Sequence, residues 1–213
     1  MRRAQQGLSL VELMVGLALG LLITGAGISL LASQWREQRS VTAGMRLMQD
    51  LRSASDVITR DLRRAGHWAD PVAATANPYG AFAPQAAASD AARFAYSRDA
   101  SENHLLDNNE QYGLRLRNGV IELLLGAGNW QALTDAGTLY VTEFSVQPQR
   151  LGVSLLEHCP RPCPAGATCE ARVEVRSVAI LIAARATSDA TVVRRLASRV
   201  RLRNDGVSGA CPA

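Results

Sequence analysis

Residues 7–12 read Gly-Leu-Ser-Leu-Val-Glu, and this hexapeptide decides how the chain is organised. Residues 1–7 form a short basic leader, and no charged side chain occurs from Leu13 to Gln34. An ordinary secretory signal is cut after its apolar region. Here the small residue stands before the apolar region, which favours cleavage between Gly7 and Leu8. The apolar segment would then stay on the mature protein.

The uncharged run Leu13–Ser33 is long enough to cross a membrane. At about 1.5 Å rise per residue, its 21 residues span roughly 30 Å, the thickness of a bilayer core. Arg2 and Arg3 precede the run, which favours a cytoplasmic N-terminus. Glu12 lies at the cytoplasmic edge of this span. A carboxylate at the bilayer centre costs about 2.5–3.5 kcal/mol. An opposite charge about 4 Å away returns about 4 kcal/mol at an effective dielectric constant of 20.

This N-terminal segment resembles the type III signal of type IV prepilins and pseudopilins. The resemblance is carried by Gly7, Leu8, Leu10, Val11, Glu12 and Leu13. It implies that a membrane-bound prepilin peptidase cuts between Gly7 and Leu8 and methylates the new N-terminus at Leu8. It also implies that Glu12 pairs with the free ammonium of Leu8 on a neighbouring subunit. The alternatives are a plain single-pass anchor and a secretory signal cut after Ser33, and N-terminal sequencing separates the three.

The overall charge of the chain is small. The formal net charge is +4, and it falls to +2 when Arg2 and Arg3 are removed with the leader. A charge of this size does not indicate binding to nucleic acid or acidic substrates. We therefore expect no nucleic-acid partner.

The sequence has no motif for catalysis. It lacks a glycine-rich phosphate loop, a G-x-S-x-G motif and an H-E-x-x-H motif, and His67, His104 and His158 are isolated from one another. We therefore expect no enzymatic activity, no cofactor, no metal and no small-molecule substrate.

Four cysteines, Cys159, Cys163, Cys169 and Cys211, fall in the last third of the chain. For an exported protein, disulfides are the expected state, and four cysteines allow three pairings. We favour a bond from Cys211 to one of the other three, which would fix the C-terminal tail. Zinc is the alternative, because His158 precedes Cys159, although the cysteine spacing does not match common zinc modules.

The helical pattern continues beyond the apolar run. Gly66 is typical of a helix stop, so we predict one helix from Leu8 to Ala65, whose second half is amphipathic. Its expected buried stripe recurs every three or four residues: Val41, Met45, Met48, Leu51, Ser55, Ile58, Leu62 and Ala65.

The remainder of the chain is predicted to be rich in strands. Asn118-Gly119, between Tyr112–Arg117 and Val120–Leu125, is a strong hairpin signal. Further strands are expected at Leu139–Val146, Arg172–Ala186 and Val192–Arg203. The predicted fold class is α+β, pilin-like, with the long N-terminal helix packed on one antiparallel sheet of about four to six strands. The expected divisions are a leader (1–7), a membrane and filament-core helix (8–35), its amphipathic continuation (36–66) and a periplasmic β-rich domain (67–213).

Two later segments resemble minor pilins of the PilW type: Arg-Asp-Leu-Arg-Arg-Ala-Gly-His-Trp-Ala-Asp at 60–70, and the block at 128–146 that contains Trp130. The resemblance implies a minor pilin that primes filament assembly at the tip of a type IV pilus. Its implied location is the inner membrane, with a periplasmic domain, and the cell surface after assembly.

The implied partners are other minor and major pilins, the prepilin peptidase, the inner-membrane assembly platform and the lipid bilayer. Three alternatives stay open from the sequence. They are a J-type pseudopilin of a type II secretion system, a tip-located binding module for adhesion or DNA uptake, and a membrane-anchored protein that never enters a filament.

Overall fold

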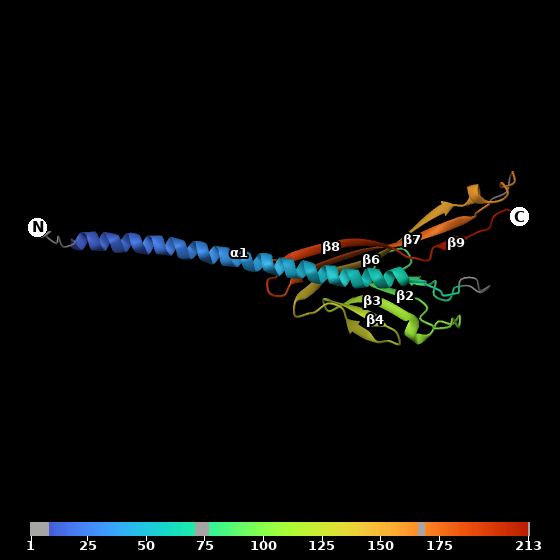
Figure 1. Cartoon of the computed structure of the whole chain (residues 1–213), viewed down its shortest axis with the longest axis horizontal. Helices are drawn as coiled ribbons and strands as arrows, with labels where there is room; N and C mark the ends of the chain where they lie inside the picture. Colours follow the sequence, from blue (N-terminus) through green and yellow to red (C-terminus); the bar gives the residue numbers. More distant parts are fainter. Residues whose placement is uncertain (1–8, 71–76, 166–168, 213) are drawn as a thin grey trace, which may run out of the picture. The chain divides into compact units, whose positions relative to one another are not determined.

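The computed structural model describes residues 9–70, 77–165 and 169–212 (Figure 1). These residues belong to two compact units, Met1–Ala43 and Gly44–Ala213. The first element, α1 (Leu10–Arg64), is a 55-residue helix, in agreement with the long helix expected from the sequence. The predicted cleavage site, Gly7 and Leu8, lies outside the described residues.

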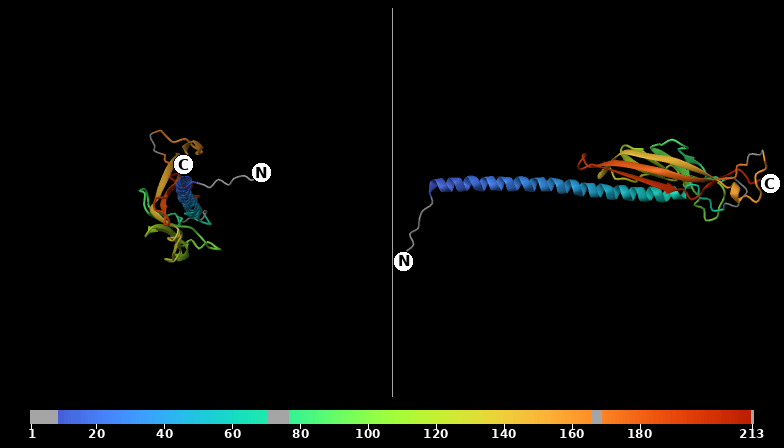
Figure 2. Two further views of the ribbon diagram at one scale, coloured as in Figure 1. Left: turned by 90° about the vertical axis from the view of Figure 1, so that its left-hand side faces the viewer. Right: turned by 90° about the horizontal axis from the view of Figure 1, so that it is seen from above.

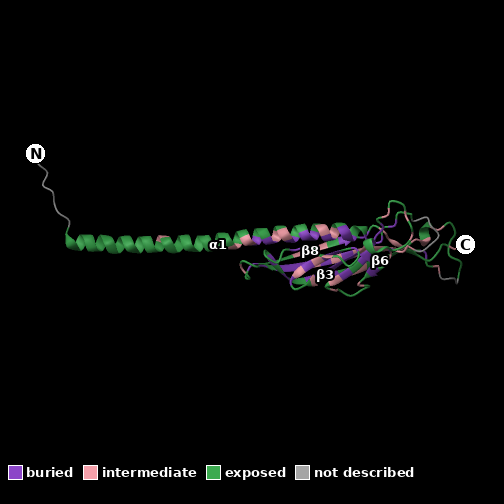
Figure 3. Ribbon diagram, turned by 90° about the horizontal axis from the view of Figure 1, so that it is seen from below, coloured by how far each residue is buried: buried purple, intermediate pink, exposed green. Residues whose placement is uncertain are grey.

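The part of α1 in the first unit has no buried residue between Leu10 and Ala43 (Figure 3). Its leucines, isoleucines and valines are exposed on every side. An 18-residue window of this helix has a mean hydropathy of 2.1, so the helix is long and apolar enough to cross a membrane. A helix that is apolar all round is typical of membrane spans and of the centres of helical assemblies.

The part of α1 in the second unit is amphipathic. Its buried apolar residues include Leu47, Leu51, Ala54, Ile58 and Leu62. The predicted stripe was correct from Leu51 onward but wrong at its start, because Val41 and Met45 are exposed and Leu47 was missed. Packing against the strands begins at Gly44, so the apolar pattern before that residue does not report a core, and Met45 lies on the exposed face of the packed part.

The β-strands form two antiparallel sheets rather than the one sheet expected. The first, sheet A, has the strand order β1-β2-β3-β4-β5. The β3–β4 hairpin turns at Asn118 and Gly119, whose φ angles of 52° and 77° are those that the Asn-Gly signal predicts. The 3-10 helix η1 (Asn108–Glu110) precedes β3. The strands are β1 (Phe82–Ala83), β2 (Ala91–Ala95), β3 (Gln111–Arg117), β4 (Val120–Leu125) and β5 (Trp130–Ala132).

The second sheet, sheet B, has the order β6-β7-β8, and β9 also pairs with β7. Its strands are β6 (Leu139–Ser154), β7 (Arg172–Ala186), β8 (Val193–Arg201) and β9 (Gly206–Ser208), and η2 (Leu156–His158) follows β6. The bounds of β7 agree with the prediction, whereas β6 continues beyond the predicted end at Val146. No ladder joins the two sheets within the described residues: β6 meets the segment before β2 through an isolated bridge between Ser89 and Val146 and a side-chain hydrogen bond from Arg150 to Gln85.

The core of the second unit lies between α1 and both sheets. Figure 2 shows the strands gathered beside the C-terminal part of α1. On the sheet B side, the Ser55 and Ser198 hydroxyls form a hydrogen bond at 3.2 Å. On the sheet A side, Tyr96 and Tyr112 stack with ring centroids 3.9 Å apart, and Phe94 stacks beside them. The α+β class and the packing of the helix on antiparallel strands are therefore confirmed.

Candidate assembly site

Glu12 lies in the first turn of α1, which begins at Leu10. The Leu13 N–H donates to the Ser9 carbonyl at 3.1 Å, so the helix is already closed around this residue. A carboxylate at this position is favoured by the exposed N–H groups of the helix start. Among the described residues, none forms an ion pair or hydrogen bond with the Glu12 side chain. Its charge is therefore not compensated by another described side chain.

The surface around Glu12 is apolar. Leu10, Val11, Leu13 and Met14 are each more than half exposed. A continuous apolar surface of this size is typical of a membrane or protein contact. The Glu12 carboxylate therefore lies at the N-terminal end of an apolar surface whose exposure to water is unfavourable.

The hydroxyl groups in the same segment are satisfied within the helix. Thr24 donates to the Gly20 carbonyl at 2.7 Å, Ser29 to the Ala26 carbonyl at 2.8 Å, and Ser33 to the Leu30 carbonyl at 2.7 Å. Polar groups in lipid must find their partners within the protein. These three side chains meet that condition, which leaves Glu12 as the polar side chain here that requires a partner.

The glycines of this segment leave flat places on the helix. A Cβ atom added at Gly16, Gly20, Gly25 or Gly27 would meet no atom within 4 Å apart from the adjacent backbone of the helix itself. Small residues at such positions allow the backbones of two apolar helices to approach closely. This surface is therefore suited to contact with neighbouring helices.

The motif at 60–70 forms the junction between α1 and the strands. Gly66 has a φ angle of +77°, which ends the helix, and its N–H donates to the Ala95 carbonyl of β2 at 2.7 Å. The Gly66 carbonyl accepts hydrogen bonds from the side chains of Asn77, at 2.9 Å, and Asn204. One glycine thus connects the helix end to sheet A, to the 77–80 turn and to the segment after β8.

Sequence reasoning did not identify the partners of this junction. Arg176 donates from Nε to the Asn204 carbonyl at 3.0 Å and from Nη1 to the Gly80 carbonyl at 3.3 Å. Burial lowers the pKa of this guanidinium, since the charged form loses solvent. Asn204 is 138 residues away from Gly66 along the chain, and no periodic pattern links the two.

The titratable side chains near Trp68 serve the fold. The buried Trp68 ring donates from Nε1 to His104 Nδ1 at 3.2 Å, and the Tyr79 hydroxyl donates to Glu102 Oε1 at 2.9 Å. Burial, followed by the bond to Glu102, raises the pKa of Tyr79. Burial opposes the ionised form of Glu102, yet bonds from Ser97, Tyr79 and two backbone N–H groups together lower its pKa. Within residues 9–70, 77–165 and 169–212 no cluster of side chains suited to a metal ion was found.

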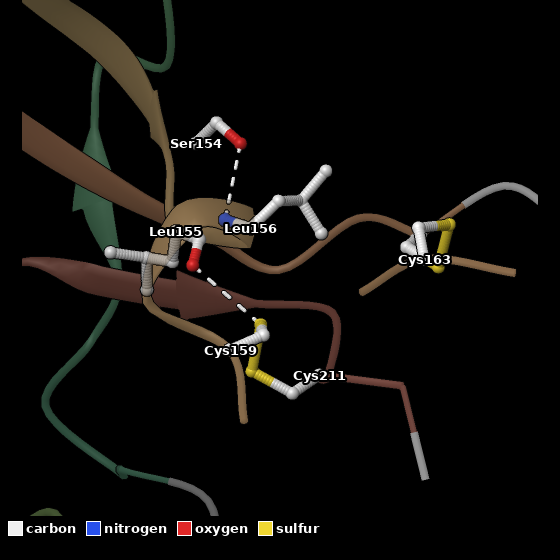
Figure 4. The surroundings of a disulfide bond; sticks show 7 residues. Ser154, Leu155, Leu156, Cys159, Cys163 and Cys211 are labelled. Atoms are coloured by element: carbon white, nitrogen blue, oxygen red, sulfur yellow. Dashed lines mark hydrogen bonds between the residues drawn. A yellow bond between two sulfur atoms is a disulfide. The ribbon is translucent and has the colours of Figure 1, made fainter. Parts of the chain in front are cut away.

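All four cysteines form disulfides: Cys159 with Cys211, and Cys163 with Cys169 (Figure 4). The zinc alternative requires free thiolates, and no free cysteine is present. The first disulfide joins the residue after η2 to the C-terminal tail, which is the arrangement favoured from the sequence. It closes the end of the molecule where β9 pairs with β7.

An apolar helix near the N-terminus, an acid in its first turn with no partner among the described residues, and an α+β domain built on its second half define a pilin-like protein. The chain belongs to the prepilin peptidase-dependent protein B family, whose profile matches residues 40–202. The prokaryotic N-terminal methylation motif matches residues 2–28. No curated protein and no solved structure showed a significant match. The two family matches confirm the resemblance to type IV pilin-like minor pilins. The protein is therefore of the pilin or pseudopilin type, with the prepilin peptidase and other pilin-class subunits as partners.

Proposed function

We propose that the protein is a minor pilin of a type IV pilus that helps to prime the filament and is located at its tip. The observation that carries this proposal is the Glu12 carboxylate, which has no partner among the described residues and lies in the first turn of the exposed apolar part of α1. Such a surface is unfavourable in an isolated subunit and favourable in an assembly that supplies an opposite charge.

In this mechanism the prepilin peptidase cuts between Gly7 and Leu8 and leaves an ammonium group on Leu8. The Leu8 ammonium of one subunit pairs with Glu12 of the next and sets the axial register of the two helices. At about 4 Å and an effective dielectric constant of 20, this pair contributes about 4 kcal/mol before its desolvation cost. The protein itself carries out no bond chemistry.

The proposed location follows from the same features. Before assembly, the apolar half of α1 spans the inner membrane with its N-terminus in the cytoplasm, and the second unit lies in the periplasm. The assembly platform then moves the subunit into the filament. The two disulfides fit an oxidising compartment, which supports export of the second unit.

A J-type pseudopilin of a type II secretion system would use the same apolar helix contacts and the same charge pairing at Glu12. It would assemble in a secretion apparatus rather than in a pilus. The gene neighbourhood separates the two roles, because it contains either minor-pilin genes or secretion genes. A tip-located binding module for DNA is less well supported, since the mature charge of +2 is too small for strong phosphate binding.

The test is the Glu12→Ala variant, with Glu37→Ala as a matched control on an exposed carboxylate of the same helix. We expect the Glu12 variant to insert and to be cleaved at Gly7, yet to produce few or no pili and no twitching motility. The Glu37 variant should produce pili normally. Normal piliation with Glu12→Ala would disprove the charge-register mechanism.

A further inference from the structure

The outer edge of β6 is open at its C-terminal end. Val146 exchanges two backbone hydrogen bonds with Ser89, at 2.8 and 3.1 Å, so its N–H and C=O point away from β7. The pairing with β7 continues from Glu143 to Ser154 without a register shift. Because the direction alternates along a strand, the backbone groups of Arg150, Gly152 and Ser154 also point outward.

These outward backbone groups have no partner among the described residues. None of the backbone hydrogen bonds outside the ladders involves the N–H groups of Arg150, Gly152 or Ser154. Pro148 has no N–H and therefore marks where the open edge begins. An exposed row of this kind is a template for pairing with another strand.

One face of the strands at this edge is apolar and exposed. The register places Leu151 opposite Val175, and places Val153, Val173 and Val207 in one row across β6, β7 and β9. Leu151, Val153 and Val207 are 65%, 43% and 74% exposed. These five side chains project to the face of sheet B opposite α1, because Ile180, whose row includes Ser198 beside the helix, lies on the other face.

The other face of the same edge carries positive charge. Arg150 pairs with Glu174 at 3.2 Å, whereas Arg172, which is exposed, forms no ion pair within the described parts of the chain. Arg172 Nη1 lies 3.9 Å from the place where a Cβ of Gly152 would stand. The register places Arg150, Arg172 and Arg176 on this face with Glu174, a formal charge of +2. A segment that binds here therefore gains from carboxylates on that side.

We infer that the Arg150–Ser154 edge of β6 is a docking site for an extended segment of another pilin-class subunit. The segment alternates aliphatic and acidic side chains. Its backbone pairs with Arg150, Gly152 and Ser154, its aliphatic side chains cover the Leu151 face, and its carboxylates meet Arg172. This inference rests on the proposed function for the identity of the partner, but the chemistry of the site is independent of it.

The chemistry is tested with the full-length protein in detergent and a capped peptide that alternates glutamate and valine. Hydrogen exchange at Arg150, Gly152 and Ser154 should slow by at least about tenfold when the peptide binds. A lysine–valine peptide should protect these amides far less. The charge-reversed variant Arg172→Glu should reverse this preference, whereas Arg199→Glu, at an exposed arginine of β8, should keep it. Equal protection by both peptides, or none, would overturn the inference.

The role of the edge is tested with Gly152→Pro. The N–H of Gly152 points away from β7, so proline removes it without breaking the β6–β7 ladder. We expect the variant to fold, with unchanged exchange in α1, and to lose peptide protection. Wild-type protection in this variant would also overturn the inference.

The partner is tested in cells with a photoreactive residue at Val153. We expect a cross-link to a segment of a pilin-class subunit that disappears with Gly152→Pro. A cross-link to a second copy of this chain, or to a protein outside the pilin class, would overturn the choice of partner. These results are distinguishable from failure of the proposed function, which the Glu12→Ala variant reports through piliation.

Discussion

The two parts of α1 form one type of secondary structure in opposite surroundings. From Leu10 to Ala43 no residue is buried, whereas from Gly44 to Arg64 a stripe of apolar residues is enclosed by the strands. Within the described residues, the first part buries none of its apolar side chains, so lipid or neighbouring helices must cover them. The second part gains its stability from packing within the subunit.

Apolar residues in one helix can therefore serve two separate purposes: membrane insertion and assembly in the first part, and stability of the folded domain in the second. Substitutions before Ala43 are expected to change insertion and assembly and to leave the folded domain intact. Substitutions after Gly44 are expected to change the stability of the domain. The predictions below test that division with pairs of equivalent residues.

The largest effect is expected for Leu51→Ala. Leu51 is 0% exposed, so its loss removes buried apolar surface and leaves a cavity, which costs about 2–5 kcal/mol. The matched variant Leu21→Ala changes a side chain that is 72% exposed and should alter the free energy of unfolding by less than about 0.5 kcal/mol. Urea denaturation of the full chain in detergent, followed by tryptophan fluorescence, measures both. Equal losses would show that the two parts of the helix do not differ in this way.

A smaller loss is expected for Gly66→Ala. The φ angle of +77° costs about 1–2 kcal/mol for a residue with a Cβ atom, and that atom would stand 3.1 Å from Arg176 Nη2. Gly25→Ala is the control, because Gly25 lies inside the helix and an added Cβ would meet no atom within 4 Å apart from the adjacent helix backbone. The control should be neutral or slightly stabilising, since alanine favours the helix. Thermal unfolding of both variants checks this, and a stable Gly66 variant would contradict the junction described above.

The sequence was most informative where a local pattern determines structure. The Asn118-Gly119 signal located the β3–β4 hairpin, and the β-branched run located β7, because turn chemistry and strand composition act over a few residues. The apolar run after Glu12 located the helix for the same reason. These features are independent of distant partners.

The parts that the sequence could not predict depend on contacts across long separations. The division into two sheets follows from how far β6 pairs along β7, and strand composition does not determine that length. The open edge at Arg150–Ser154 is visible only once the bridge to Ser89 fixes the direction of the backbone groups. The start of the buried stripe was wrong because an apolar pattern cannot show whether a strand or a membrane covers it.

The smallest effect concerns Asp61, a buried acid in the packed part of α1. Loss of solvent raises the pKa of its carboxyl group, and the nearby Arg60 and Arg64 offset part of that shift. The folded state therefore binds the Asp61 proton more tightly than the unfolded state, whose value is 3.8. Stability contributed by the protonated form is lost as the pH rises from about 3.8 through the folded-state pKa.

Asp61→Asn should remove this contribution, because the amide does not ionise. We expect the variant to gain stability relative to the wild type as the pH rises through this range, and the difference to level off above it. The control Asp56→Asn changes an exposed carboxylate of the same helix and should follow the wild type. Unfolding free energies measured in urea between pH 3 and pH 7 give the comparison. If the difference in unfolding free energy between Asp61→Asn and the wild type instead stays constant across this pH range, the expectation is wrong. In that case ionisation of the buried carboxyl group costs nothing, because the packed part of α1 is more open to water than its contacts indicate.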